Sequence, residues 1–276
     1  MVEDVVTPSG PYRLRLMARD GRWSAPLAAG DTAAAWQRSD GRVVVRAGTE
    51  AGLLCARSML ALADDTAQFH HRFARDPLIG ASSRALVGYR PLRLATVAHA
   101  TLRAITGQLI EASRARAIER SVLRTCGERV ATQPALARLS PAELRRLGLA
   151  THRASTLVRL ARSIDLERLR DHPTDAVLAR LARERGVGPW SVGVIALQGL
   201  GRYDHGIVGD LGLVKLASAL WRRSVDGHET AALLAPYGEW QGLAGEVLML
   251  GWRLGLVAGA DPDVGRLARV SARRAA

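Results

Sequence analysis

The 276-residue sequence has only two cysteines, Cys55 and Cys126, and a single lysine, Lys215. Two thiols are too few for a disulfide framework, a cysteine-rich zinc site or a four-cysteine iron–sulfur cluster, so we expect no metal and no cofactor. No apolar run approaches the roughly 20 residues that a transmembrane helix needs, which argues against a membrane protein. No secretory signal stands at the start, and we expect a reducing, cytoplasmic setting.

Acidic residues are also in deficit. The chain carries 26 Asp and Glu against 39 Lys and Arg, which gives a formal net charge of +13. This excess favours an anionic partner, with nucleic acid ahead of a membrane surface. All the basic residues but one are arginine, whose planar donor fork suits phosphate oxygens. A hydrophobic content of 48% argues against wholesale disorder.

The first third of the chain has the pattern of a small sheet. The segments Tyr12–Met17, Ala33–Arg38 and Arg42–Ala47 are short, and the last two flank Asp40-Gly41, a strong two-residue hairpin signal. A helix is predicted to follow over Glu50–Ala63.

The remainder has a helical pattern almost throughout. Residues 76–91, which contain Pro77, Gly80, Gly88 and Pro91, predict a connector between an N-terminal domain (1–88) and a helical domain (89–276). The fold class predicted is therefore mostly α, with a small N-terminal α/β sheet domain. The helical segments expected are 97–126, a short helix opened by a capping box at Ser140, then 151–163, 174–185, 190–198, 211–221 and 239–254.

A glycine-rich turn lies between two of these helical segments. Gly186 and Gly188 let the backbone turn with no Cβ in the way, so that main-chain N–H groups can approach a phosphate. Pro189 stands where a new helix would begin, and Val187 is expected to be buried in the turn. Taken alone, the pattern equally fits an ordinary helix end followed by a new helix.

Two further segments follow in order, Gly199–Asp204 and Val208–Leu213. Together with the turn they resemble the helix-hairpin-helix DNA glycosylases, in particular the branch of 3-methyladenine DNA glycosylase II. The similarity covers roughly the last two thirds of the chain, including residues 102–109 and 144–160. It implies a monomeric enzyme that hydrolyses the N-glycosidic bond of alkylated bases in double-stranded DNA and that acts in the cytoplasm on the nucleoid.

The resemblance places Asp210 at the position of the catalytic aspartate. Loss of a base leaves an oxocarbenium-like sugar, which a nearby carboxylate stabilises or helps a water to attack. Asp210 is also a good N-cap for the helix predicted at 211–221, and the two roles are compatible. Asp204, the nearest alternative, is expected to be a loop residue.

The position of the lysine bears on the mechanism. Bifunctional relatives carry a Schiff-base lysine near the start of the second hairpin helix, where this chain has Trp190. We therefore expect a monofunctional enzyme without lyase activity. Trp190 and Trp252 match the aromatic base pocket, although ordinary core packing would also explain both residues. Trp240 is interpreted as structural and Trp221 as a core residue.

DNA contacts are expected from several segments. Leu109 matches the residue that fills the gap left by a flipped nucleotide, with Gln108 as a polar contact beside it. Burial along the stripe of Leu102, Ile105 and Leu109 is the alternative, and exposure of Leu109 would decide between the two. The remaining residues predicted to bind DNA are Arg153, Gly186, Val187, Gly188 and Ser191.

Two other functions remain open. One is a non-catalytic DNA-binding protein that keeps the hairpin but lacks a working pocket. The other is a glycosylase for oxidised or deaminated bases. Val194 and residues 241–244 depart from the family pattern near the base site, and they put the substrate range in doubt more than the type of reaction.

Overall fold

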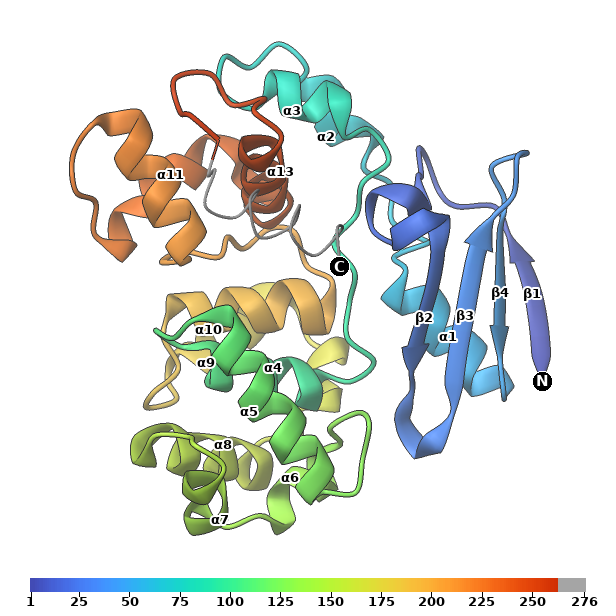
Figure 1. The fold of residues 1–276 in the computed structure, drawn as a ribbon, viewed down its shortest axis with the longest axis vertical. Coiled ribbons are helices and arrows are strands. Elements are labelled where there is room, and N and C mark those ends of the chain that lie inside the picture. The colour runs from blue at the N-terminus through green and yellow to red at the C-terminus, as the bar shows by residue number, and fades with distance from the viewer. Residues whose placement is uncertain (263–276) are drawn as a thin grey trace, which may run out of the picture.

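The computed structural model describes residues 1–262 (Figure 1). A four-stranded antiparallel sheet of order β1-β4-β3-β2 stands beside a larger helical body. This architecture confirms the predicted fold class. The strands are β1 (Val2–Val6), β2 (Arg22–Pro26), β3 (Thr32–Gln37) and β4 (Val43–Ala47).

The hairpin predicted around Asp40-Gly41 is confirmed. It joins β3 to β4, and Gly41 adopts a φ of 86°, which a glycine tolerates without strain. The strand predicted at Tyr12–Met17 is wrong, because this segment forms a 3-10 turn at Leu14–Leu16. This segment bonds to the side chain of Gln37 and not to a neighbouring strand. Gln37 accepts a hydrogen bond from Leu14 N at 2.9 Å and donates one to Tyr12 O at 2.9 Å. Strands β1 and β2 were not predicted from the sequence.

Helix α1 (Glu50–Met59) covers the sheet. It begins at Thr49, whose hydroxyl accepts a hydrogen bond from Gly52 N at 3.0 Å, and it ends four residues earlier than predicted because Ala61 turns to a φ of 54°. Apolar side chains of the sheet and α1 form the first core, including Trp23, Leu27, Val43, Val45, Leu53 and Leu60.

The predicted connector at residues 76–91 contains a packed helix. Helices α2 (Ala67–Arg72) and α3 (Gly80–Ala85) both lie against the helical body, and Phe69 and Ile79 are fully buried in its core. Helix α3 contacts α13 closely enough that a Cβ on Gly251 would lie 2.5 Å from the Cβ of Ser82. The connector is thus packed on the helical body, where the apolar side chains of Ile79 and Leu86 are buried. The division into domains at residue 88 stays a prediction.

The helical body has a second core, separate from that of the sheet. The stretch predicted at 97–126 is divided by a loop at residues 108–111, and the capping box at Ser140 is confirmed by reciprocal bonds with Glu143. The helices of this body are α4 (Val97–Gly107), α5 (Ala112–Thr125), α6 (Gln133–Arg138), α7 (Pro141–Arg146), α8 (Thr151–Ser163), α9 (Thr174–Ala182), α10 (Pro189–Val194), α11 (Leu211–Trp221), α12 (Thr230–Leu234) and α13 (Gln241–Arg253).

Helix α10 does not stop at Val194. It runs on as a π-helical segment over Ile195–Leu200 and ends at Gly201, whose φ of 70° closes the helix. The chain then crosses from the group of helices around α4 and α10 to the group of α11 and α13 (Figure 1). Asp210 lies at the end of this crossing. No helix within residues 1–262 has the length and apolarity required to cross a membrane.

Candidate active site

The glycine-rich turn forms a hairpin between α9 and α10. Gly186 has a φ of 85°, and a Cβ there would lie 2.5 Å from Thr156 Oγ1, so both its conformation and its contact require glycine. Val187 is buried, as predicted, and Gly188 is the N-cap of α10. The two glycines are exposed, which leaves the main chain of the turn open to an approaching phosphate.

Asp210 is held by hydrogen bonds to both of its carboxylate oxygens. Oδ1 accepts from Gly212 N at 2.7 Å, which makes Asp210 the N-cap of α11, and Oδ2 accepts from Trp190 Nε1 at 3.0 Å. The two bonds fix the orientation of the carboxylate at the start of α11. Asp210 remains partly exposed, so the carboxylate can reach a bound molecule. Asp204 lies exposed in a loop, as expected.

Trp190 lies across α4. A Cβ on Gly107 would lie 2.6 Å from Cη2 of the indole ring, so only glycine allows the ring to approach this helix. The indole therefore contacts α4 with its ring and Asp210 with its N–H group.

A cavity of about 780 Å³ opens beside these residues. Trp190 and Asp210 both line it, and its wall includes residues of α4, α5, α8, α10, α11 and α13. Its volume lies within the range of about 300 to 1,000 Å³ that is usual for small-molecule sites, so a nucleobase fits. Lys215 also lines the cavity from α11 and is exposed.

The loop at residues 108–111 stands at the rim of the cavity. Leu109 is 83% exposed and adopts a left-handed φ of 48°, so it does not continue the buried stripe of α4. Gln108 donates from Nε2 to Gly186 O at 2.8 Å and to Ser191 Oγ at 2.9 Å. Gln108 therefore ties this loop to the hairpin, and its amide N–H groups are engaged within the protein.

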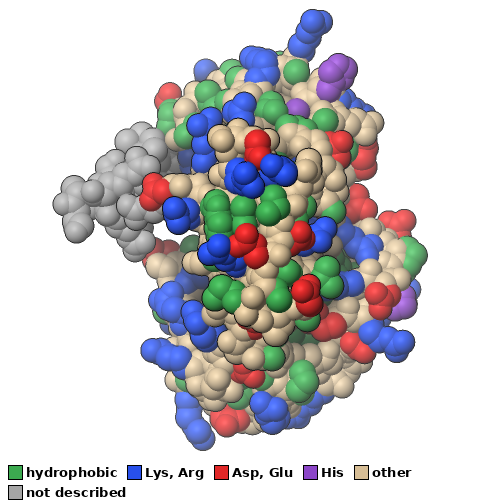
Figure 2. Space-filling model, turned by 90° about the vertical axis from the view of Figure 1, so that its right-hand side faces the viewer, with side chains coloured by type: hydrophobic (Ala, Val, Ile, Leu, Met, Phe, Trp, Pro, Cys, Tyr) green, Lys and Arg blue, Asp and Glu red, His purple; other side chains and the backbone are tan. Residues whose placement is uncertain are grey.

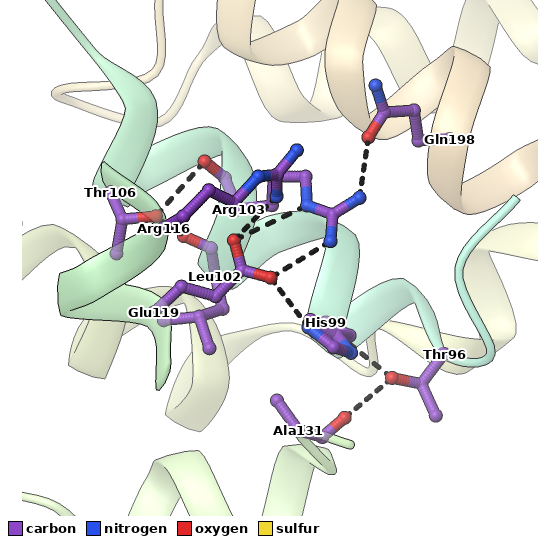
Figure 3. Close-up of polar contacts among 9 residues, drawn as sticks. All are labelled: Thr96, His99, Leu102, Arg103, Thr106, Arg116, Glu119, Ala131 and Gln198. Carbon is purple, nitrogen blue, oxygen red and sulfur yellow. Dashed lines mark hydrogen bonds and ion pairs between the residues drawn. The ribbon is translucent and has the colours of Figure 1, made fainter. Parts of the chain in front are cut away.

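An ion cluster joins the two helices on either side of that loop (Figure 3). The buried Glu119 of α5 bonds to His99 Nε2 and Arg103 Nη2 of α4, both at 2.9 Å, and to Arg116 Nη1 at 2.7 Å. Arg103 extends the cluster to Gln198 Oε1 at 3.3 Å. Burial opposes ionisation of Glu119, but its hydrogen bonds from His99 and Arg103 and the neighbouring positive charges outweigh burial and lower its pKa. The cluster fixes α4 relative to α5.

The structure does not bring all the predicted residues to the cavity. Trp252 is buried, donates from Nε1 to Asp261 O at 2.6 Å, and is not among the described residues that line the cavity. Its assignment to the base pocket is not supported, because the ring faces the core and the segment after α13. Ser191 is 1% exposed and bonded to Gln108, so its side chain does not face solvent.

Arg153 lies on the cavity wall, at the start of α8. Its Nε is buried without a hydrogen-bond partner among the described residues, and burial lowers the pKa of its guanidinium.

The two other tryptophans differ in burial. Trp240 packs on the core and stacks with Tyr203 at 6.1 Å, as expected, whereas Trp221 is 36% exposed, so its assignment to the core is wrong.

Sequence reasoning missed three acidic residues that line the cavity, Glu111, Glu119 and Glu246. Glu246 lies on α13 and lines the cavity together with Asp210. Its signal was available, because it is the one acidic residue in the otherwise apolar stretch at residues 240–252. Residues 1–262 contain no group of three His, Cys, Asp or Glu side chains placed to hold a metal ion.

Comparisons with known proteins rest on structure alone. No protein-family model and no curated protein matches the sequence. A 3-methyladenine DNA glycosylase from Archaeoglobus fulgidus superposes with a TM-score of 0.73 at 18% identity, covering 92% of this chain and 99% of the other. An 8-oxoguanine glycosylase/lyase from Clostridium acetobutylicum, solved with double-stranded DNA, gives a TM-score of 0.71 at 17% identity and covers 87% of each chain.

A third similar structure is a 3-methyladenine DNA glycosylase from Schizosaccharomyces pombe in complex with abasic DNA. Its TM-score is 0.56 at 16% identity, and the match covers 70% of this chain and 98% of the other. The first two matches span the sheet as well as the helical body, because they cover most of this chain. The hairpin, the aspartate at the start of α11 and these likenesses agree: the chain has the fold of the helix-hairpin-helix DNA glycosylases.

Proposed function

We propose that the protein is a monofunctional DNA glycosylase of base excision repair. It hydrolyses the N-glycosidic bond of alkylated bases in double-stranded DNA and leaves an abasic site. The observation that carries the proposal is the carboxylate of Asp210, oriented by Gly212 N and Trp190 Nε1 at the wall of a cavity large enough for a base. A protein that only bound DNA would need neither the cavity nor the oriented acid.

The geometry supports a sequence of events. The hairpin holds a phosphate through its main chain, and the exposed Leu109 enters the space left when a nucleotide is extruded from the stack. The extruded base enters the cavity beside Trp190, whose electron-rich ring attracts a positively charged alkylated purine. Asp210 then stabilises the cationic sugar as the bond to the base breaks, and it directs a water to the anomeric carbon.

Absence of lyase activity is part of the proposal. A Schiff base needs an amine at the anomeric carbon, and the hairpin helix offers Trp190 at that place. Lys215 is the only lysine of the chain and reaches the cavity from α11 instead. We expect no covalent adduct when the protein is incubated with borohydride and duplex DNA containing a damaged base. A trapped complex that disappears in Lys215→Ala would show that α11 supplies the nucleophile.

The proposed partner is duplex DNA, bound by a monomer in the cytoplasm. The net charge of +13 supports an anionic partner, and two of the similar structures contain DNA. The exposed Arg183 and Arg185 flank the hairpin, and neither forms an ion pair with a described residue. Both guanidinium groups are therefore available to phosphates.

The deciding experiment is the release of free bases from methylated genomic DNA, identified by mass. We expect release of 3-methyladenine by the wild-type protein, and release of 7-methylguanine in addition if the cavity is permissive. The variant Asp210→Asn keeps the shape of the side chain and removes its charge, and it should bind DNA without releasing a base. DNA binding by the wild-type protein with no base released would favour the non-catalytic alternative.

A further inference from the structure

The cavity holds a second carboxyl group that the proposed reaction does not use. Glu246 lies on α13 and lines the same cavity as Asp210 and Trp190. It is partly buried among apolar neighbours, and both Val247 and Met249 of its helix are buried. A carboxyl group in such surroundings is costly to keep ionised unless it is paired.

The groups around Glu246 provide no such pairing. Its hydrogen-bond partner within residues 1–262 is Tyr89 Oη, which donates to Oε2 at 3.2 Å. Burial raises the pKa of Glu246, and the negative charge of Asp210 on α11 raises it further. The hydrogen bond from Tyr89 and the positive charge of Arg253 act in the opposite direction without offsetting burial. Lys215 of α11 and His228, just before α12, are two further titratable side chains that line the cavity.

Two carboxyl groups in one cavity thus have different environments. Asp210 accepts a hydrogen bond from Gly212 N at the start of α11, whereas burial raises the pKa of Glu246. In glycosidic hydrolysis, two carboxyl groups in different environments divide the roles of acid and base between them.

Resting on the function proposed above, we propose that Glu246 is a second catalytic residue, the proton donor to a departing base that carries no positive charge. This role widens the substrate class of the site from cationic alkylated purines to uncharged altered purines.

The proton balance of the step is as follows. The electron pair of the bond between the anomeric carbon and the base passes to the base, which would leave as an anion. Glu246 transfers its proton to a ring nitrogen, so the base leaves neutral and Glu246 becomes a carboxylate. A water adds to the cationic sugar and its proton passes to Asp210. Exchange with solvent then returns a proton to Glu246 and removes one from Asp210.

A cationic alkylated purine needs no such donor. It leaves as a neutral molecule once the bond has broken, so its release depends on Asp210 and less on Glu246. The role of Glu246 therefore appears in the ratio of the two rates. A merely structural role of Glu246 would lower both rates together.

The test compares duplexes with a single 7-methylguanine, which is cationic, or a single hypoxanthine, which is uncharged, under single-turnover conditions. Glu246→Gln should lower hypoxanthine release about 100-fold more than 7-methylguanine release, the size of effect expected of a general acid. The control Glu239→Gln removes an exposed acid on the segment before α13, which pairs with Arg72 at the surface, and should leave both rates unchanged. Equal effects of Glu246→Gln on both substrates would overturn the proposal.

A second variant covers the case in which Glu246→Gln does not fold. Tyr89→Phe removes the hydrogen bond that lowers the pKa of Glu246, so the acid should stay protonated to higher pH. Hypoxanthine release by the wild type should fall with rising pH, and this fall should move to higher pH in Tyr89→Phe. An unmoved profile contradicts the role of Glu246.

The wild-type protein separates the two proposals. Release of 7-methylguanine without hypoxanthine overturns the role of Glu246 and leaves the glycosylase function standing. Release of neither base, with no 3-methyladenine released from methylated DNA either, overturns the proposed function itself.

Discussion

Trp190 has two contacts that together set the position of Asp210. The indole N–H donates to Asp210 Oδ2, while the ring rests on α4 at Gly107, where no larger residue fits. A ring in this place is therefore both part of the cavity wall and the support of the acid. Sequence reasoning assigned the first role to Trp190, and only the structure shows the second.

Trp190→Phe tests the support of Asp210 directly. The phenyl ring keeps most of the packing on α4 but loses the hydrogen bond to the carboxylate. A hydrogen bond to a charged group contributes about 1.5 to 3 kcal/mol, so we expect the single-turnover rate of base release to fall about 10- to 100-fold. The measurement is that rate at saturating protein, with thermal unfolding as the control for the fold. An unchanged rate would show that Asp210 is positioned by its cap bond alone.

At this scale the sequence predicted residues whose roles follow from local pattern. Asp210 precedes a helix, and Gly186 and Gly188 bracket a turn, so the short-range signal was sufficient. Trp252 could not be placed in this way, because an aromatic residue on an apolar helix fits a cavity wall and a core equally well. Its burial depends on how α13 packs, which no local pattern specifies.

In the proposed reaction, opening of the duplex depends on the loop at residues 108–111. It is held at one side by the Glu119 cluster, which fixes α4 to α5 (Figure 3), and at the other by the hydrogen bonds of Gln108 to the hairpin. Between these supports Leu109 projects into solvent in a left-handed conformation that costs a non-glycine residue about 1 to 2 kcal/mol.

Leu109→Gly separates stability from function in this loop. The exposed side chain contributes little burial, and glycine accepts the backbone conformation, so the free energy of unfolding should change by less than about 1 kcal/mol. Base release from a fully paired duplex should fall at least about 10-fold, because nothing fills the vacated stack. Release from single-stranded DNA serves as the comparison and should fall less. A large loss of stability would mean that Leu109 packs on the protein.

The Glu119 cluster predicts a dependence of stability on pH. Its carboxyl has a lowered pKa in the folded protein, so it binds a proton more readily when unfolded. Its stabilising contribution is present above the pKa of an unfolded glutamate, about 4.3, and is lost as the pH falls below that value. Glu119→Gln should lower the free energy of unfolding at pH 7 by about 3 kcal/mol and flatten its decline below about pH 5. Denaturant titrations at several pH values measure both effects, with the exposed Glu239→Gln as the control.

Element boundaries were predictable where a local signal marks them. The capping box at Ser140 and the hairpin at Gly41 both stand where expected. Strand β1 was not predictable, because it is an edge strand whose pairing partner, β4, lies some forty residues away along the chain. Helix α3 was missed for a similar reason, since its six residues carry little periodicity and are stabilised by packing on α13.

At the scale of the whole molecule, the arginines of the sheet and those of the hairpin differ in whether an acidic side chain neutralises them. Figure 2 shows the side that carries the sheet, where basic and acidic side chains are interspersed. Several arginines there are paired with acids, including Arg42 with Asp40 and Arg46 with Glu3. Arg183 and Arg185 beside the hairpin have no such partners among the described residues. The charge therefore favours DNA binding at the hairpin over the sheet.

The double variant Arg183→Ala/Arg185→Ala measures this difference. Each phosphate contact contributes about 0.9 to the slope of log K against log salt concentration, so the slope should become shallower by up to about 1.8 and affinity should fall at low salt. The matched control Arg42→Ala/Arg46→Ala removes two arginines from the sheet and should leave the slope unchanged. A shallower slope for the control alone would place the DNA on the sheet side.

The central claim is that the carboxylate of Asp210 enables hydrolysis of the bond between base and sugar. Its most direct test is the single-turnover release of 7-methylguanine from a duplex by wild-type protein and Asp210→Asn, with DNA affinity measured on the same samples. We predict that the variant binds the duplex as tightly as the wild type and releases the base at least about 100-fold more slowly. Release at the wild-type rate by Asp210→Asn would contradict the account.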